Sequence, residues 1–181
     1  MTCIAGLIDN GKVYIGGDSA GVAGWELHIR ADQKVFRNGP FIMGFTSSFR
    51  MGQLIRFKLQ PPSLFNSDGT LKDIYEYMVA DFVEAVRQCL KDGGYAERRN
   101  DVEQGGTFLV GYENRLFIVE SDYQVAELVN GYTAIGCGGQ IANGALFATQ
   151  GMQPKERLLM ALMAAETHNA GVRGPFVVVS T

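Results

Sequence analysis

Two Asn-Gly dipeptides constrain the fold of this 181-residue chain more than any other sequence feature. The first, at residues 10–11, separates apolar segments at 2–8 and 12–17, and the second, at 38–39, separates a strand region at 27–37 from one at 40–46. Both residues of such a pair tolerate positive φ, so Asn-Gly between apolar runs predicts a two-residue hairpin turn. The first two segments are apolar on both faces, which indicates a sheet that is covered on each side.

The two turns also predict which residues face each other. If the first Asn-Gly pair is a two-residue loop, counting outward places Cys3 opposite Asp18. If the second pair is likewise the loop, Lys34 lies opposite Met43 and one step from Gly44. Both hairpins would then bring polar residues to the same end of the sheet as the N-terminus, unless a bulge shifts the register.

The rest of the chain alternates helices and strands. Residues 21–26 form a glycine-containing bend, Ser47-Ser48 can cap a helix that ends before Pro61-Pro62, and Thr70 opens a capping box before a second helix. A loop is expected at 92–106, strands at 107–110, 116–119, 125–129, 132–135 and 175–180, and helices after residues 136–139 and from 154 to about 167. This order favours one α+β domain over residues 1–181, a four-layer αββα sandwich of two antiparallel sheets flanked by helix pairs.

Composition excludes several classes of function. The net charge of −3 gives no basic signature for nucleic acid or an anionic membrane, and no apolar run approaches the length of a membrane span. Three separated cysteines and two histidines argue against a zinc site and favour a reducing compartment, so we expect a cytoplasmic protein with no metal or organic cofactor. The sequence lacks the pattern of a signal peptide.

The chemistry of the chain is expected to centre on Thr2. Once Met1 is removed, Thr2 carries a hydroxyl nucleophile and a free α-amino group that can act as its base. Taken singly, Asp18 after two glycines could be a turn residue, and Lys34 could be a solvated charge on a strand. The hairpin register weakens both alternatives, because it brings the two residues toward the end of the sheet that holds Thr2. Cys137 lies in a Gly-rich turn, but without a His partner or a following Gly-Lys-Ser/Thr it is expected to support the site at most.

With these residues the sequence resembles the proteasome β-subunit family of N-terminal nucleophile hydrolases, and it is similar in length to the bacterial ring peptidase HslV. The matching segments are Thr2 directly after Met1, Gly-Gly-Asp-Ser-Ala-Gly-Val at 16–22, Lys34 before an apolar residue, Ile-Met-Gly at 42–44, and Ile-Gly-Cys-Gly-Gly at 135–139. The resemblance covers essentially the whole chain. The spacing of Thr2, Asp18 and Lys34 is the most specific of them.

The resemblance implies a role for each matching residue. Thr2 Oγ would attack a peptide carbonyl with its own α-amino group as base, Lys34 would stabilise the alkoxide, and Asp18 would hold Lys34. The N–H of Gly44 would donate to the oxyanion. The remaining implied residues are those that pair with the substrate backbone (Gly21, Val22 and Thr46) and those that line the first specificity pocket (Ala20, Phe36 and Ile42, with Arg50 at its base).

The chain also departs from the family pattern. Cys137 stands where the family usually has serine, and Asn169 and Val172 stand where an acidic residue and a second serine are expected. The resemblance implies a threonine peptidase that degrades unfolded protein or peptides inside stacked hexameric or heptameric homo-oligomeric rings, with an AAA+ ATPase unfoldase as a possible partner. The departures keep a catalytically weak or inactive ring-forming homologue as the alternative, and an amidase acting on small substrates is a third reading.

Overall fold

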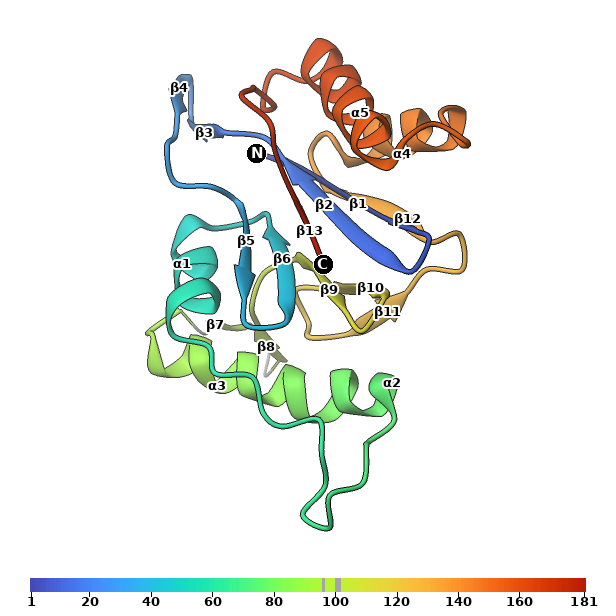
Figure 1. The fold of residues 1–181 in the computed structure, drawn as a ribbon. Helices are drawn as coiled ribbons and strands as arrows, with labels where there is room; N and C mark the ends of the chain where they lie inside the picture. Colours follow the sequence, from blue (N-terminus) through green and yellow to red (C-terminus); the bar gives the residue numbers. More distant parts are fainter. Residues whose placement is uncertain (96, 100–101) are drawn as a thin grey trace.

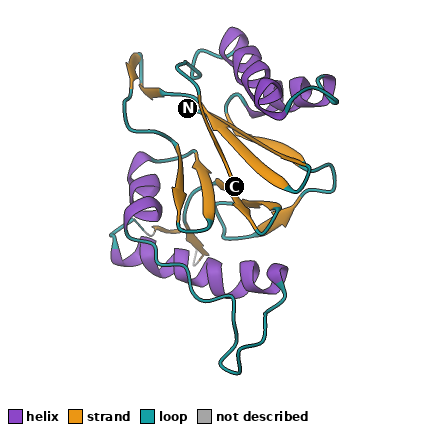
Figure 2. Cartoon of the chain, in the orientation of Figure 1, coloured by secondary structure: helices purple, strands orange, loops and turns teal. Residues whose placement is uncertain are grey.

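The computed structural model describes residues 1–95, 97–99 and 102–181, and it has the predicted four layers (Figures 1 and 2). One antiparallel sheet has the strand order β12-β1-β2-β13, and the other has the order β11-β10-β9-β6-β5. The strands of the first sheet are β1 Cys3–Asp9, β2 Lys12–Gly17, β12 Tyr132–Gly136 and β13 Val177–Ser180. Those of the second are β5 Val35–Asn38, β6 Phe41–Phe45, β9 Phe108–Tyr112, β10 Arg115–Val119 and β11 Val125–Glu127.

Helices cover the outer face of each sheet. On the first sheet lie α4 (Gly139–Ala148) and α5 (Pro154–His168), with Pro154 as the first helical residue, as predicted. On the second lie α1 (Phe49–Phe57) and a long helix that runs through α2 (Ile74–Tyr77), a π-helical turn (Met78–Phe82) and α3 (Val83–Asp92). Among the described helices none is both long enough and apolar enough to cross a membrane.

Strand alternation divides the core into three layers. In β1 the side chains of Cys3, Ala5 and Leu7 pack under α4 and α5, whereas Ile4 points the other way, between the two sheets. The layer between the sheets is aliphatic and includes Ile15 of β2. A third, aromatic-rich layer lies between the second sheet and its helices. This double coverage explains why the first strands are apolar on both faces.

The first hairpin has the predicted register and the second does not. Asp9 pairs with Lys12 around Asn10 and Gly11, both at positive φ. In the second hairpin Asn38 pairs with Phe41, so the turn residues are Gly39-Pro40 and Lys34 lies opposite Phe45, whose N–H donates to its carbonyl (3.1 Å).

A competing role for Asn38 accounts for this two-residue shift. Its side-chain amide donates to Ile55 O and Leu59 O at the end of α1, which keeps Asn38 in the strand. Gly39 (φ +56°) followed by the fixed negative φ of Pro40 then supplies a turn of the type II′ kind. A shift of two residues leaves every side chain on its predicted face.

Three other expectations were wrong locally. Residues 20–29 form a separate hairpin, β3 (Ala20–Ala23) with β4 (Glu26–Ile29), where a bend and the start of a longer strand were predicted. The second helix is capped by Asp73, which accepts from Glu76 N–H (2.9 Å), because Thr70 is bonded instead to Asp68. In the predicted loop 92–106, β7 (Glu97–Arg99) pairs with β8 (Val102–Gln104), and residues 96, 100 and 101 lie outside the described residues.

Candidate active site

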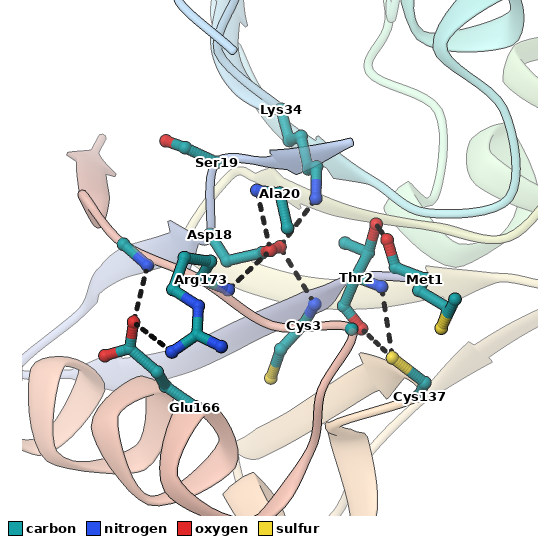
Figure 3. A network of polar contacts seen from close by, with 12 residues as sticks. Met1, Thr2, Cys3, Asp18, Ser19, Ala20, Lys34, Cys137, Glu166 and Arg173 are labelled. Carbon is teal, nitrogen blue, oxygen red and sulfur yellow. Dashed lines mark hydrogen bonds and ion pairs between the residues drawn. The ribbon is translucent and has the colours of Figure 1, made fainter. Parts of the chain in front are cut away.

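Three separate chain segments meet at one end of the first sheet (Figure 3). Thr2 directly precedes β1, Asp18 directly follows β2, and Lys34 directly precedes β5. The first hairpin brings two of these segments together, since Asp18 N–H donates to Cys3 O (3.2 Å). The predicted convergence of Thr2, Asp18 and Lys34 is therefore present in the structure.

Asp18 and Lys34 form a buried ion pair. Lys34 Nζ lies 2.7 Å from Asp18 Oδ1, and the two side chains are 1% and 0% exposed. Burial lowers the pKa of Lys34, and the adjacent Asp18 carboxylate opposes this shift. Lys34 is therefore not a solvated charge, and Asp18 makes the local backbone bond of a turn residue to Ala20 N–H in addition to its ion pair.

Backbone groups complete the shell of the Asp18 carboxylate. Oδ1 accepts from Cys3 N–H (3.0 Å) as well as from Lys34, and Oδ2 accepts from Ala20 N–H (3.0 Å) and Arg173 N–H (3.3 Å). Because Cys3 N–H and Lys34 Nζ share one oxygen, the ammonium group lies beside the Thr2–Cys3 peptide, and Figure 3 shows it on the side of Thr2. A positive charge therefore lies next to the candidate nucleophile.

Thr2 is 5% exposed and is held by its neighbours. In the structure Met1 is joined to it, Thr2 N–H donates to Cys137 Sγ (3.2 Å), and Thr2 Oγ1 donates to Met1 O. Gly138 N–H donates to Thr2 O (3.3 Å), and Gly136 (φ +91°) passes so close that a Cβ there would lie 2.3 Å from Thr2 O. The glycine at the end of β12 therefore allows the Thr2 backbone to pack closely against this turn.

Cys137 and Asn169 form the opposite side of the site. Cys137 Sγ lies within hydrogen-bonding distance of Thr2 O (3.4 Å) and Asn169 Oδ1 (3.2 Å). The Asn169 amide donates to Cys137 O (2.8 Å), and its Oδ1 also accepts from Gly171 N–H (2.9 Å). Cys137 and Asn169 thus form a polar network, without a carboxylate, next to the Thr2 nitrogen. Val172, in contrast, is wholly buried in the core below α5.

Only two of the predicted substrate-binding residues line a cavity at Thr2. Val22 and Thr46 border a cavity of about 80 Å³, together with Phe45, Ser48 and Phe49. The other predicted residues do not line this cavity. Ala20 is buried, Gly21 pairs with His28 in the β3–β4 hairpin, Phe36 packs in the aromatic-rich core, Ile42 packs between the sheets, and Arg50 donates to Gly93 O on the far side of α1.

The two-residue shift of the second hairpin does not account for these placements, because it leaves every side chain on its predicted face. Phe36 and Ile42 were assigned to the pocket by the family resemblance, and both occupy strand positions that face a core layer. The aromatic walls come from Phe45 at the end of β6 and from Phe49 in the first turn of α1. No local sequence pattern distinguishes these two from other core aromatics.

Gly44 is not placed to bind an oxyanion. It pairs with Val35 on one side and Leu109 on the other, and a Cβ there would lie 2.6 Å from Ile4 in the layer between the sheets. Thr46 N–H donates to Thr107 O, and hydrogen-bonded pairs recur every second residue in an antiparallel ladder, so the Gly44 N–H faces Leu109. The prediction for Gly44 was therefore wrong.

Ser47 is the residue at this strand end that sequence reasoning missed. It follows Thr46, has φ +68°, and borders both cavities that meet at Met1. Within the described part of the chain its N–H has no hydrogen-bond acceptor, while its hydroxyl accepts from Thr107 N–H (3.2 Å). An unpaired N–H at a left-handed residue is the kind of donor that an oxyanion requires. The serine pair after an apolar strand indicated a helix cap but not this second feature.

The chain was compared with known proteins. No protein-family model matches it, and no curated protein matches its sequence. Its fold is similar to that of BPH from Thiobacillus denitrificans in complex with epoxomicin (TM-score 0.79, 19% identity, 99% of this chain and 98% of that one). It is also similar to HslV from Trypanosoma brucei (0.68, 17%, 99% and 98%) and to an Anbu mutant from Hyphomicrobium sp. strain MC1 (0.71, 15%, 99% and 80%).

These likenesses extend over nearly the whole chain at identities of 15% to 19%, and they concern the fold. The layer order and the two antiparallel sheets agree with what the sequence motifs predicted. The chain therefore has the N-terminal nucleophile hydrolase fold of the proteasome and HslV kind.

Proposed function

We propose that this chain is a threonine peptidase whose nucleophile is Thr2 after removal of Met1. One observation supports this most strongly: the buried Asp18–Lys34 pair, 2.7 Å apart, holds an ammonium group beside the residue that would become the N-terminus. A buried ion pair is costly to desolvate and is weak evidence for a purely stabilising role. Perturbed titratable groups next to a candidate nucleophile favour catalysis.

The proposed reaction proceeds through an acyl-enzyme. Thr2 Oγ attacks the carbonyl carbon of the substrate while its proton passes to the free α-amine, whose ordinary pKa is about 8. Lys34 stabilises the developing alkoxide, and the Ser47 N–H, in place of Gly44, donates to the oxyanion. The leaving amine takes the proton from the α-amine, and water then cleaves the ester to restore the Thr2 hydroxyl.

Cys137 and Asn169 would position the base in this mechanism. The Thr2 nitrogen lies 3.2 Å from Cys137 Sγ, and Asn169 holds the thiol from its other side. After removal of Met1 the Thr2 nitrogen would be a free α-amine at the same position, oriented by the same contact with Cys137 Sγ. Asn169 brings no negative charge to this network, and this neutrality supports the alternative of a catalytically weak or inactive ring-forming homologue.

Assembly with further copies of the chain is part of the proposal. Exposed apolar side chains occur at the tip of the β3–β4 hairpin (Trp25) and along α4 and α5 (Phe147, Met160 and Met163). These exposed apolar side chains are the candidates for contact with another copy of the chain. Stacked hexameric or heptameric rings in the cytoplasm would enclose the sites, and an AAA+ unfoldase would then deliver unfolded substrates. Analytical ultracentrifugation of the full chain tests this directly, and a monomer at micromolar concentration would contradict it.

The decisive experiment for the nucleophile is intact mass spectrometry before and after treatment with epoxomicin, which the Thiobacillus denitrificans BPH structure contains. We expect loss of Met1, one adduct per chain, and no adduct in Thr2→Ala. Thr167→Ala is the matched control, since Thr167 is exposed and its hydroxyl, among the described residues, bonds only to Met163 O within α5. Turnover of a peptide library should follow the same pattern. A retained Met1, or equal turnover by Thr2→Ala, would favour the inactive homologue or another nucleophile.

A further inference from the structure

Two cavities of different character meet at the N-terminus. Met1 borders both the 80 Å³ cavity beside Phe49 and a larger one of about 530 Å³. The larger cavity extends from Cys137 and Thr46 to Thr107 and Glu120, along the ends of β6, β9, β10 and β12. Once Met1 is removed, a peptide that places its carbonyl at Thr2 can extend into both.

Among the described residues that line the larger cavity, Glu120 is the only one with a charged side chain. It follows β10, is half-buried, and accepts a hydrogen bond from Thr107 Oγ1 (3.3 Å) through Oε2. Among the described residues no Lys, Arg or His forms an ion pair with it. Glu127 on the neighbouring strand β11, in contrast, forms an ion pair with Arg115 at the start of β10.

A half-buried carboxylate without a counter-charge favours a cation from outside the chain. Its attraction for a positive group exceeds that of a fully solvated carboxylate, because the surrounding protein lowers the effective dielectric constant. The cavity also carries apolar surface from Ala134 and Ile135, along which the methylene stem of a long basic side chain can pack. The neutral amide of Gln140 adds a polar group without adding charge.

We propose that this larger cavity binds a lysine or arginine side chain of the substrate, with Glu120 as the residue that determines the specificity. The inference rests on the proposed peptidase function and names its substrate class: peptides with a basic residue near the bond that is cleaved. The small cavity has aromatic walls and, among its described lining residues, no charged side chain, so it gives no such preference.

The test compares pairs of peptides that differ only by Lys against Leu, with the substitution moved through the positions on both sides of the cleaved bond. At one position the wild-type protein should prefer Lys by about tenfold in kcat/KM, which corresponds to about 1.4 kcal/mol. Glu120→Gln should abolish this preference, measured as the ratio of kcat/KM for the Lys and Leu peptides. Glu120→Lys should reverse the preference toward an acidic residue.

Glu156→Gln is the matched control, because Glu156 lies exposed in the first turn of α5 and the substitution changes the net charge equally. It should keep the preference for Lys. The preference should also weaken as ionic strength rises. Equal turnover of Lys and Leu peptides at every position, or a Lys preference that survives in Glu120→Gln, would overturn the proposal.

A binding measurement separates this inference from the proposed function. On Thr2→Ala, fluorescence anisotropy with the same labelled peptides should show about tenfold tighter binding of the Lys peptide, lost when Glu120→Gln is added. Absence of Thr2-dependent turnover with this binding difference present would contradict the peptidase proposal alone. Thr2-dependent turnover without any binding difference would contradict the role of Glu120 alone.

Discussion

Replacing Asp18 by asparagine tests the electrostatic design of the site most directly. The substitution preserves shape but leaves Lys34, whose side chain is 1% exposed, as a buried cation without a counter-charge. The asparagine NH₂ would also face two donors in either orientation. In place of Oδ2 it would face the N–H groups of Ala20 and Arg173, and in place of Oδ1 it would face Cys3 N–H and Lys34 Nζ. We therefore expect the free energy of unfolding to fall.

The expected loss is about 3–5 kcal/mol at pH 7, the usual cost of removing one partner of a buried ion pair. For a domain of this size, each 1 kcal/mol lowers the midpoint of thermal unfolding by about 2–4 °C. Lys34→Met should cost less, because the Asp18 carboxylate would keep its three backbone donors. In the double variant the loss should be well below the sum of the two, since no buried cation remains.

The pH dependence of this loss has a definite sign. The pKa of Lys34 in the folded protein is lowered from 10.5 by burial, and removing Asp18 lowers it further. Between the folded and unfolded pKa values the unfolded chain binds more protons, so stability rises with pH there, by at most about 1.4 kcal/mol per pH unit for one group. This window extends further toward neutral pH in Asp18→Asn. The deficit of the variant should therefore shrink as the pH rises from 7 toward 10.

Urea denaturation of the four proteins of this cycle, at pH 7 and at pH 9.5, measures both effects. The chains share one fold, so their m-values should agree and the midpoints report stability. A loss below 1 kcal/mol in Asp18→Asn, additive effects of the two substitutions, or a deficit that grows with pH would each refute the reasoning. Any of these would mean that Lys34 is neutral in the folded protein or reaches solvent in the variant.

Three further predictions concern single sites. Gly136→Ala should cost about 2–4 kcal/mol in urea denaturation, because the residue has φ +91° and its Cβ would lie 2.3 Å from Thr2 O, whereas Gly144→Ala, open inside α4, should be neutral or stabilising. Gly44→Ala should cost about 1–3 kcal/mol by overpacking the layer between the sheets; a cost near zero would contradict the placement of Gly44. Phe49→Ala should enlarge the 80 Å³ cavity and shift cleavage of a peptide library toward larger side chains, and an unchanged cleavage pattern would show that this cavity does not bind substrate.

The sequence by itself determined the layers of this protein and the centre of its site. Apolar segments around Asn10-Gly11 set the register of the first hairpin, and that register places Cys3 beside Asp18. Hairpin turns are decided by two residues whose φ preferences are local, so they can be read without the rest of the chain. The same holds for Ser48 and Pro154, which begin helices through contacts within one turn.

The tertiary structure alone decided the walls of the site. Asn38 bonds to the end of α1, which moved the second turn by two residues, and the pairing of Gly44 with Leu109 turns its N–H into the sheet. The Ser47 N–H, which has no acceptor among the described residues, and the position of Glu120 beside the N-terminus likewise depend on strands far apart in the sequence. Such groups come together through packing between layers, and the energy of that packing has no counterpart in the local preferences of any single segment.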